Sequence, residues 1–178
     1  MKTIFFLGNV GKQYEFTRHN AAWILSDFII KSNVSWSFVA NKRLDVLECK
    51  ISLYGKDVLL IKPTTLMNRS GKAVIKTIQY YKLKSTDIII AYDDLDVPLG
   101  KIRVMPNSYP KIHNGVNSVK EVLQNFLSIR IGIDSRNGNR EIPADEYVLQ
   151  VFDKEELETL IETCKSLSDK HVLKQYLE

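Results

Sequence analysis

The stretch Ile88-Ile89-Ile90-Ala91-Tyr92-Asp93-Asp94 decides the fold. A short, unbroken apolar run bounded by polar residues is typical of a strand that is covered on both faces, as in a parallel sheet. The run ends in an acidic cluster formed by Asp93, Asp94 and Asp96. In open α/β sheets, binding groups collect beyond the carboxyl ends of such strands. The stretch therefore predicts a central strand that is followed directly by functional side chains.

Segments on either side of this strand alternate between strand-like and helix-like patterns. Strands are expected at residues 3–7, 44–53, 58–62, 101–105 and 128–133, with a hairpin turn between the second and third of these. Helices are expected at residues 21–29, at 115–126, at 157–167, and from a cap at Ser70 to Tyr81. The alternation predicts an α/β fold. We expect one domain over residues 1–178, a sandwich with a central mixed, mostly parallel twisted sheet flanked by helices.

Composition places few limits on function. Lys and Arg exceed Asp and Glu by 25 − 21 = 4, which suits RNA as a partner and equally suits an ordinary basic surface. The two cysteines form neither a disulfide framework nor a zinc motif, as expected for a cytoplasmic protein. No apolar run approaches the roughly 18 residues of a membrane span, and the run Ile4–Leu7 is too short for a signal peptide. We expect a cytoplasmic protein that does not contact a membrane.

Five polar positions have the residue types that hydrolysis of a carbonyl compound needs. They are Asn9 after the first strand, His19 at the start of a helix, Asn68 in a loop, Asp93, and the pair His113-Asn114 before another helix. Histidine is suited to general-base work near neutral pH, and a carboxylate fixes its tautomer. Asparagine amides can donate to a developing oxyanion. Taken singly, each position is more often a cap or a turn residue. His171 lies near the C-terminus, apart from these five positions, and is expected at the surface.

Other chemistries find less support. The chain has no GxSxG elbow, no GxxxxGK[ST] phosphate loop and no HExxH. Gly8-Asn9-Val10-Gly11 follows a strand but is not the GxGxxG of dinucleotide-binding proteins. The acidic cluster at residues 93–96 stays open as a metal site, although no further ligands accompany it at matching spacing.

Five segments, taken in order, carry a resemblance to a known family. They are Gly8-Asn9-Val10-Gly11 with Tyr14 and Thr17-Arg18-His19-Asn20; Pro63-Thr64-Thr65-Leu66-Met67-Asn68-Arg69-Ser70-Gly71; Tyr92-Asp93-Asp94-Leu95-Asp96-Val97-Pro98-Leu99-Gly100; His113-Asn114-Gly115; and Arg130-Ile131-Gly132-Ile133. In this order and in register over residues 3–152, they resemble the bacterial peptidyl-tRNA hydrolases.

The resemblance implies hydrolysis of the ester bond between peptide and tRNA, which recycles tRNA from prematurely released peptidyl-tRNA. It implies that His19 is the base, that Asp93 orients it, that Asn68 and Asn114 hold substrate and oxyanion, and that Asn9 contacts the peptide. The other substrate or tRNA contacts that it implies are Tyr14, Leu66, Met67, His113 and Arg130, of which Arg130 faces a tRNA phosphate. It implies a monomer without metal or organic cofactor.

The chain departs from the family pattern at several positions. Leu66 replaces an aromatic residue, Tyr92 replaces a histidine, and residues 105–112 replace a glycine-rich loop. Met105 stands where the family has a phosphate-facing lysine, for which Arg103 and Lys111 are candidate substitutes. Two alternatives stay open: an RNA-binding relative without activity, and an esterase for a small carbonyl substrate.

Overall fold

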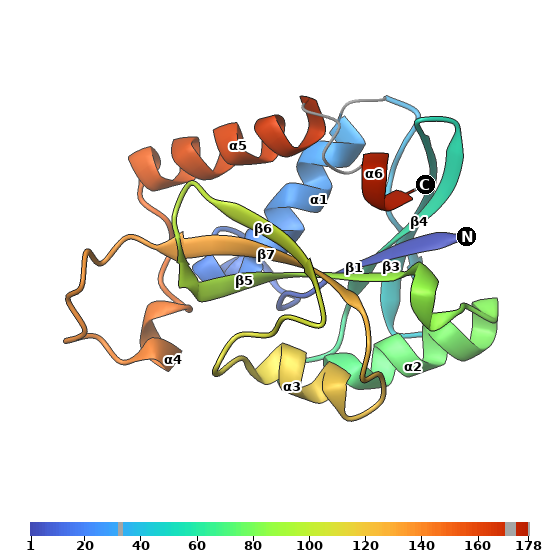
Figure 1. Cartoon of the computed structure of the whole chain (residues 1–178), viewed down its shortest axis with the longest axis horizontal. Coiled ribbons are helices and arrows are strands. Elements are labelled where there is room, and N and C mark those ends of the chain that lie inside the picture. Colours follow the sequence, from blue (N-terminus) through green and yellow to red (C-terminus); the bar gives the residue numbers. More distant parts are fainter. Residues whose placement is uncertain (32–33, 170–173, 178) are drawn as a thin grey trace.

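One sheet lies between two layers of helices in this protein. The computed structural model describes residues 1–31, 34–169 and 174–177, so His171 lies outside the described residues. Helices α1 (Ala21–Lys31) and α5 (Lys154–Asp169) cover one face, and α2 (Ser70–Tyr81) and α3 (Asn114–Lys120) cover the other (Figure 1). Within the described part of the chain, no helix has the length and apolar character to cross a bilayer. The expected α/β sandwich is confirmed.

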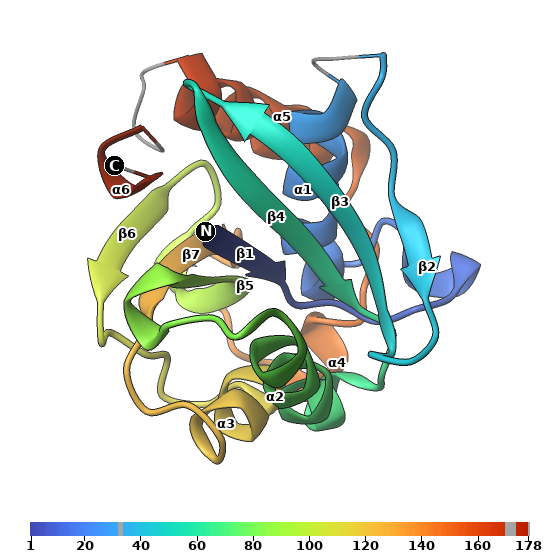
Figure 2. The same cartoon turned by 90° about the vertical axis from the view of Figure 1, so that its right-hand side faces the viewer.

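The sheet is mixed, with the order β2-β3-β4-β1-β5-β7-β6 over the described residues. Its strands are β1 (Lys2–Phe6), β2 (Val39–Asn41), β3 (Val46–Leu53), β4 (Lys56–Pro63), β5 (Ile88–Pro98), β6 (Ile102–Pro106) and β7 (Leu127–Asp134). The four central strands β4, β1, β5 and β7 pair in parallel, whereas β2, β3 and β6 pair in antiparallel fashion toward the edges (Figure 2). The carboxyl ends of the four parallel strands therefore meet at one side of the molecule.

Strand β1 is buried on both faces, which explains its unbroken apolar sequence. Ile4 and Phe6 pack with the α1 and α5 layer, while Phe5 and Leu7 pack with the α2 and α3 layer, and all four are fully buried. Each such side chain contributes about 1.5–3 kcal/mol through loss of apolar surface to water. A strand covered on both sides shows no alternation of apolar and polar residues.

Short helices connect these elements. They are η1 (Lys12–Tyr14), η2 (Arg18–Asn20), η3 (Met67–Arg69), η4 (Ser85–Asp87), α4 (Ala144–Tyr147) and α6 (Lys174–Leu177). Two of them, η2 and η3, run directly into α1 and α2. The predicted Ser70 cap is wrong for this reason: Ser70 is the first residue of α2, and its hydroxyl donates to the carbonyl of Met67 at 2.9 Å.

Two boundaries also differ from the sequence prediction. The acidic cluster lies within β5, which continues to Pro98 beside β7 with a register shift after Asp94. Helix α3 ends at Lys120 instead of continuing to Phe126. Phe126 nevertheless packs in the core between the sheet and the α2 and α3 layer. The Asn107 amide donates to its carbonyl at 3.1 Å, which ties this segment to the end of β6. The apolar residues between Lys120 and Phe126 have helical spacing in the sequence, although this segment is irregular in the structure.

Helices α2 and α3 approach each other closely at Gly71. A Cβ atom on Gly71 would lie 2.1 Å from the carbonyl oxygen of Ser118, and the Gly71 amide donates to the Ser118 hydroxyl at 3.1 Å. We expect Gly71→Ala to lower the free energy of unfolding by about 1–3 kcal/mol, because overpacking outweighs the better helix propensity of alanine. Urea unfolding measures this, with Gln79→Ala on the exposed side of α2 as a control that changes it by less than about 0.5 kcal/mol. Equal stability of the Gly71 variant and the wild type would contradict the close approach.

Candidate active site

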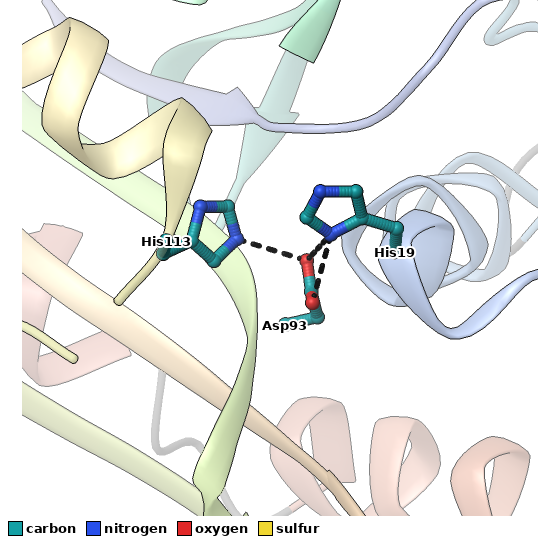
Figure 3. Close-up of side chains that lie close together, drawn as sticks. All are labelled: His19, Asp93 and His113. Carbon is teal, nitrogen blue, oxygen red and sulfur yellow. Dashed lines mark hydrogen bonds and ion pairs between the residues drawn. The ribbon is translucent and has the colours of Figure 1, made fainter. Parts of the chain in front are cut away.

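His19 and Asp93 form a buried pair, in which Asp93 lies in the middle of β5 and His19 lies in η2. The His19 Nδ1 lies 2.9 and 3.0 Å from the two carboxylate oxygens of Asp93, and both side chains are buried (Figure 3). Burial alone would lower the pKa of His19, but the charge and the hydrogen bond of Asp93 raise it above the ordinary value of 6.5. Burial would likewise raise the pKa of Asp93, yet His19 and His113 hold it well below its usual range. Asp93 is therefore ionised and His19 is a stronger base than free histidine.

His113 completes this pair as a second donor to Asp93. Its Nε2 lies 3.0 Å from Asp93 Oδ1, on the opposite side from His19. Its Nδ1 caps helix α3 by accepting from the amides of Gly115 at 3.1 Å and Val116 at 3.2 Å. Because two backbone N–H groups point at Nδ1, the proton of His113 resides on Nε2 and is donated to Asp93. The tautomer of His113 is thus fixed by the start of α3.

The same three residues have the composition of a metal site. Among the described residues, His19, Asp93 and His113 offer ligand atoms that all lie within 4.8 Å of one another. To bind a metal through Nε2, however, His113 would have to carry its proton on Nδ1, which faces the two α3 amides. The arrangement therefore favours a hydrogen-bonded network over a metal centre.

The backbone of η2 is held by the segment that precedes α5. The His19 amide donates to the carbonyl of Val148 at 2.8 Å, and the Arg18 amide donates to Gln150 at 3.0 Å. The Arg18 guanidinium, itself buried, bonds both carboxylate oxygens of Glu156 at 2.7 and 2.8 Å. Arg18 thus joins η2 to the start of α5 and fixes the position of its neighbour His19.

Asn9 is positioned by Asn20, a residue whose role the sequence did not reveal. The Asn20 Oδ1 accepts from the Asn9 amide at 2.7 Å, and its Nδ2 donates to the Asn9 carbonyl at 3.0 Å. The Asn9 Oδ1 accepts from the Met67 amide at 3.2 Å, which leaves its Nδ2 as a donor for a ligand. The only sequence signal was the place of Asn20 directly after His19.

Replacement of Asn20 should disturb Asn9 without touching any reacting group. We expect Asn20→Ala to lower kcat about 10-fold and stability by about 1–3 kcal/mol, because two buried backbone groups of Asn9 lose their partner. Hydrolysis kinetics and urea unfolding measure the two effects. Asn117→Ala, an exposed position on α3, is the control. Unchanged kinetics in Asn20→Ala would show that Asn9 needs no such support.

The other asparagines differ from Asn9 in being exposed. Asn68 in η3 and Asn114 at the start of α3 make no side-chain hydrogen bond to another described residue, so both amides can bind a ligand. Asn114 lies beside His19 and Asp93, in a cavity of about 70 Å³. The cavity is lined by His19, Asp93, Leu95, Ile112, His113, Asn114, Ala144, Asp145 and Val148. Asn9 and Asn68 lie outside its lining.

The remaining expected contacts occupy different environments. Met67 is buried against Gly115. A Cβ atom added to Gly115 would lie 2.4 Å from the sulfur of Met67. Leu66 is 59% exposed, and Tyr14 lies half-buried in η1, where its carbonyl accepts from Thr17. Neither Leu66 nor Tyr14 lines the cavity beside His19.

Arg130 lies differently from the expected phosphate-facing side chain. It is 8% exposed, its Nε donates to Asp94 at 2.6 Å, and its NH1 nitrogen donates to the Ser108 hydroxyl at 2.7 Å. The charge of Asp94 therefore compensates Arg130, and a contact with tRNA phosphate stays a prediction. The hydroxyl of Tyr92 donates to the Ser108 carbonyl at 2.9 Å, so the altered loop is anchored at Ser108 from two strands.

Known proteins match nearly the whole chain. The family described as Peptidyl-tRNA hydrolase matches residues 3–177. A peptidyl-tRNA hydrolase of Pediococcus pentosaceus is 40% identical over 159 residues, which cover 88% of this chain and 83% of that protein. One of Mesoplasma florum is 39% identical over 171 residues, covering 95% and 90%. The crystal structure of peptidyl-tRNA hydrolase from Acinetobacter baumannii is similar with a TM-score of 0.81 and 28% identity, covering 99% and 92% of the two chains.

Proposed function

The chain belongs to the peptidyl-tRNA hydrolase family, and we propose from this membership and from the buried histidine–aspartate network that His19 activates the water which cleaves the ester bond of peptidyl-tRNA. The observation that carries the proposal is the pair of His19–Asp93 contacts at 2.9 and 3.0 Å. They fix the proton of His19 on Nδ1, which leaves the Nε2 lone pair to accept a proton from water.

The reaction balances with these groups alone. Nε2 of His19 takes a proton as the water oxygen bonds to the ester carbonyl carbon, and Asp93 stabilises the resulting imidazolium. The tetrahedral intermediate then expels the ribose oxygen, which takes the proton from His19. The products are a peptide with a free carboxyl group and a tRNA with a free terminal hydroxyl. Because an alkoxide is a better leaving group than an amide nitrogen, no covalent intermediate is required.

The asparagines supply donors around the reacting carbonyl. Asn114 lies beside His19 in the cavity and, with Asn68, donates to the substrate and to the developing oxyanion. The Nδ2 of Asn9 contacts the peptide backbone, since its oxygen is already bonded to Met67. Leu66 and Tyr14 extend the surface that faces the substrate, and the buried Met67 supports it from beneath Gly115. His113 acts through Asp93. A monomeric cytoplasmic enzyme stays part of this proposal.

The test compares two substrates in the presence of EDTA. Purified protein is incubated with N-acetyl-phenylalanyl-tRNA and with unblocked phenylalanyl-tRNA, and release of the acyl group is followed. We expect release from the blocked substrate only, with the same rate with and without chelator. Binding of tRNA without release would favour an RNA-binding relative, and equal turnover of a simple acetyl ester would favour a small-substrate esterase.

A further inference from the structure

The mild net charge of this chain conceals a strong separation of charges across the sheet. Residues 69–84, which contain α2, have five basic residues and no acidic one. Residues 153–162, at the start of α5, have five acidic residues and one lysine. Helices α2 and α5 lie on opposite faces of the sheet (Figures 1 and 2). The α2 side of the molecule is therefore basic and the α5 side acidic.

Two cations of α2 and the last residue of η3 form a stripe along the exposed face of α2. Arg69, Lys72 and Lys76 recur three and four residues apart, which places their side chains on the same side of a helix, and all three are exposed. Arg43, from the turn between β2 and β3, joins them by lying 5.3 Å from the ring of Tyr80. We call Arg43, Arg69, Lys72 and Lys76 the α2 stripe. Among the described residues, Asp45 is the one carboxylate that forms an ion pair with the stripe, through Lys76 at 2.5 Å.

A surface hollow of about 300 Å³ opens on this stripe. It is lined by Arg43, Leu44, Lys76, Gln79 and Tyr80. Two cations, an amide and an aromatic ring that is 49% exposed meet there. The cations of this hollow can bind phosphate oxygens. The tyrosine ring can pack against a sugar or stack on a base.

The stripe also leads away from the catalytic site. Arg69 follows Asn68 directly, and α2 extends from there with a rise of about 1.5 Å per residue. Tyr80 therefore lies roughly 18 Å along the helix from Asn68. A polyanion that places its end at His19 can continue along α2, whereas the acidic α5 side repels it.

We propose that the α2 stripe and its hollow bind the sugar-phosphate backbone of the tRNA while the acylated end occupies the catalytic site. The proposal rests on the proposed function, because it takes tRNA as the substrate body. It assigns phosphate binding to exposed cations, whereas Arg130 is buried and bonded to Asp94. Binding through phosphates is insensitive to tRNA sequence and sensitive to salt.

The experiment measures binding and turnover separately. Affinity for deacylated tRNA is measured by fluorescence anisotropy at several salt concentrations. Turnover is measured with N-acetyl-phenylalanyl-tRNA and with the 3′ ester of N-acetyl-phenylalanine and adenosine, which lacks the tRNA body. The variants are K72Q/K76Q on α2 and Arg43→Gln on the turn, which reports on the same hollow without altering the helix. The matched control is K154Q/K165Q, which removes two exposed charges from α5.

We expect K72Q/K76Q to raise the Kd for tRNA at least 10-fold and to reduce the slope of log Kd against log salt by about 2. The KM for the acylated tRNA should rise with little change in kcat, and turnover of the adenosine ester should stay the same. Arg43→Gln should reduce the slope by about 1, and the control should bind like wild type. A wild-type Kd and slope in both stripe variants, or no tRNA binding by the wild type, would overturn the proposal. If the wild type hydrolyses neither substrate, the proposed function fails, and the binding measurements still decide the role of the stripe.

Discussion

Replacing His19 with alanine should reduce kcat for N-acetyl-phenylalanyl-tRNA by at least about 100-fold. The variant loses the one base that lies in the cavity with its Nδ1 proton fixed by Asp93. We expect a residual rate, because Asn68 and Asn114, the proposed donors to the substrate and the oxyanion, are unchanged. Single-turnover hydrolysis with saturating enzyme measures the chemical step directly.

Binding of tRNA separates loss of chemistry from loss of fold in this variant. His19→Ala should bind deacylated tRNA with an affinity within about threefold of wild type, because the base contacts water and not phosphate. The backbone of His19 stays bonded to Val148 in the variant, so η2 keeps its position. Retention of more than a tenth of the wild-type kcat would show that another group activates the water.

Replacing Asp93 with asparagine should reduce kcat by about 10²–10⁴, although the side chain keeps its shape. Asp93 accepts hydrogen bonds from two histidines, His19 and His113. The amide replaces one of the two oxygens that face His19 Nδ1 with an N–H group. That group opposes a histidine proton, so one histidine must change tautomer. His113 cannot do so without opposing the amides of Gly115 and Val116. His19 therefore takes the wrong tautomer and loses the charge that stabilises its imidazolium.

A nearby carboxylate provides the matched control for this change. Asp96 lies on the same strand, is exposed, and accepts only from the Lys111 amide at 3.3 Å among the contacts of the described residues. Asp96→Asn should keep kcat within about threefold of wild type, measured in the same assay. Equal losses in the two variants would mean that general electrostatics of the acidic cluster, and not the pairing of Asp93 with two histidines, governs the rate.

The sequence predicted the elements of the sheet better than their arrangement. The apolar runs of β1 and β5 identify strands that are buried on both faces, because no polar residue interrupts them. The insertion of β1 between β4 and β5 depends on pairing between residues more than 50 positions apart, such as Phe5 with Ile61. Local patterns do not contain such information.

For the candidate site too, the sequence predicted the residues better than their arrangement. The types and order of His19, Asp93 and Asn114 made a hydrolytic site predictable, and these residues do meet in one cavity. Nothing in the sequence indicated that His113 would cap α3 with one nitrogen and reach Asp93 with the other. Nor could it indicate that Arg130 would pair with Asp94, since the two lie on neighbouring strands and 36 positions apart.

The dependence of kcat/KM on pH tests the central role of the His19–Asp93 pair most directly. His19 must be unprotonated to act as a base, and Asp93 raises its pKa above 6.5, so the activity of the wild type should rise with pH through a midpoint above 6.5. In Asp93→Asn the residual activity should rise through a lower midpoint, because the opposing effect of burial on the pKa of His19 remains. A wild-type profile that is flat between about pH 5.5 and 8.5, or a midpoint that Asp93→Asn leaves unchanged, would contradict the assignment of His19 as the base that Asp93 controls.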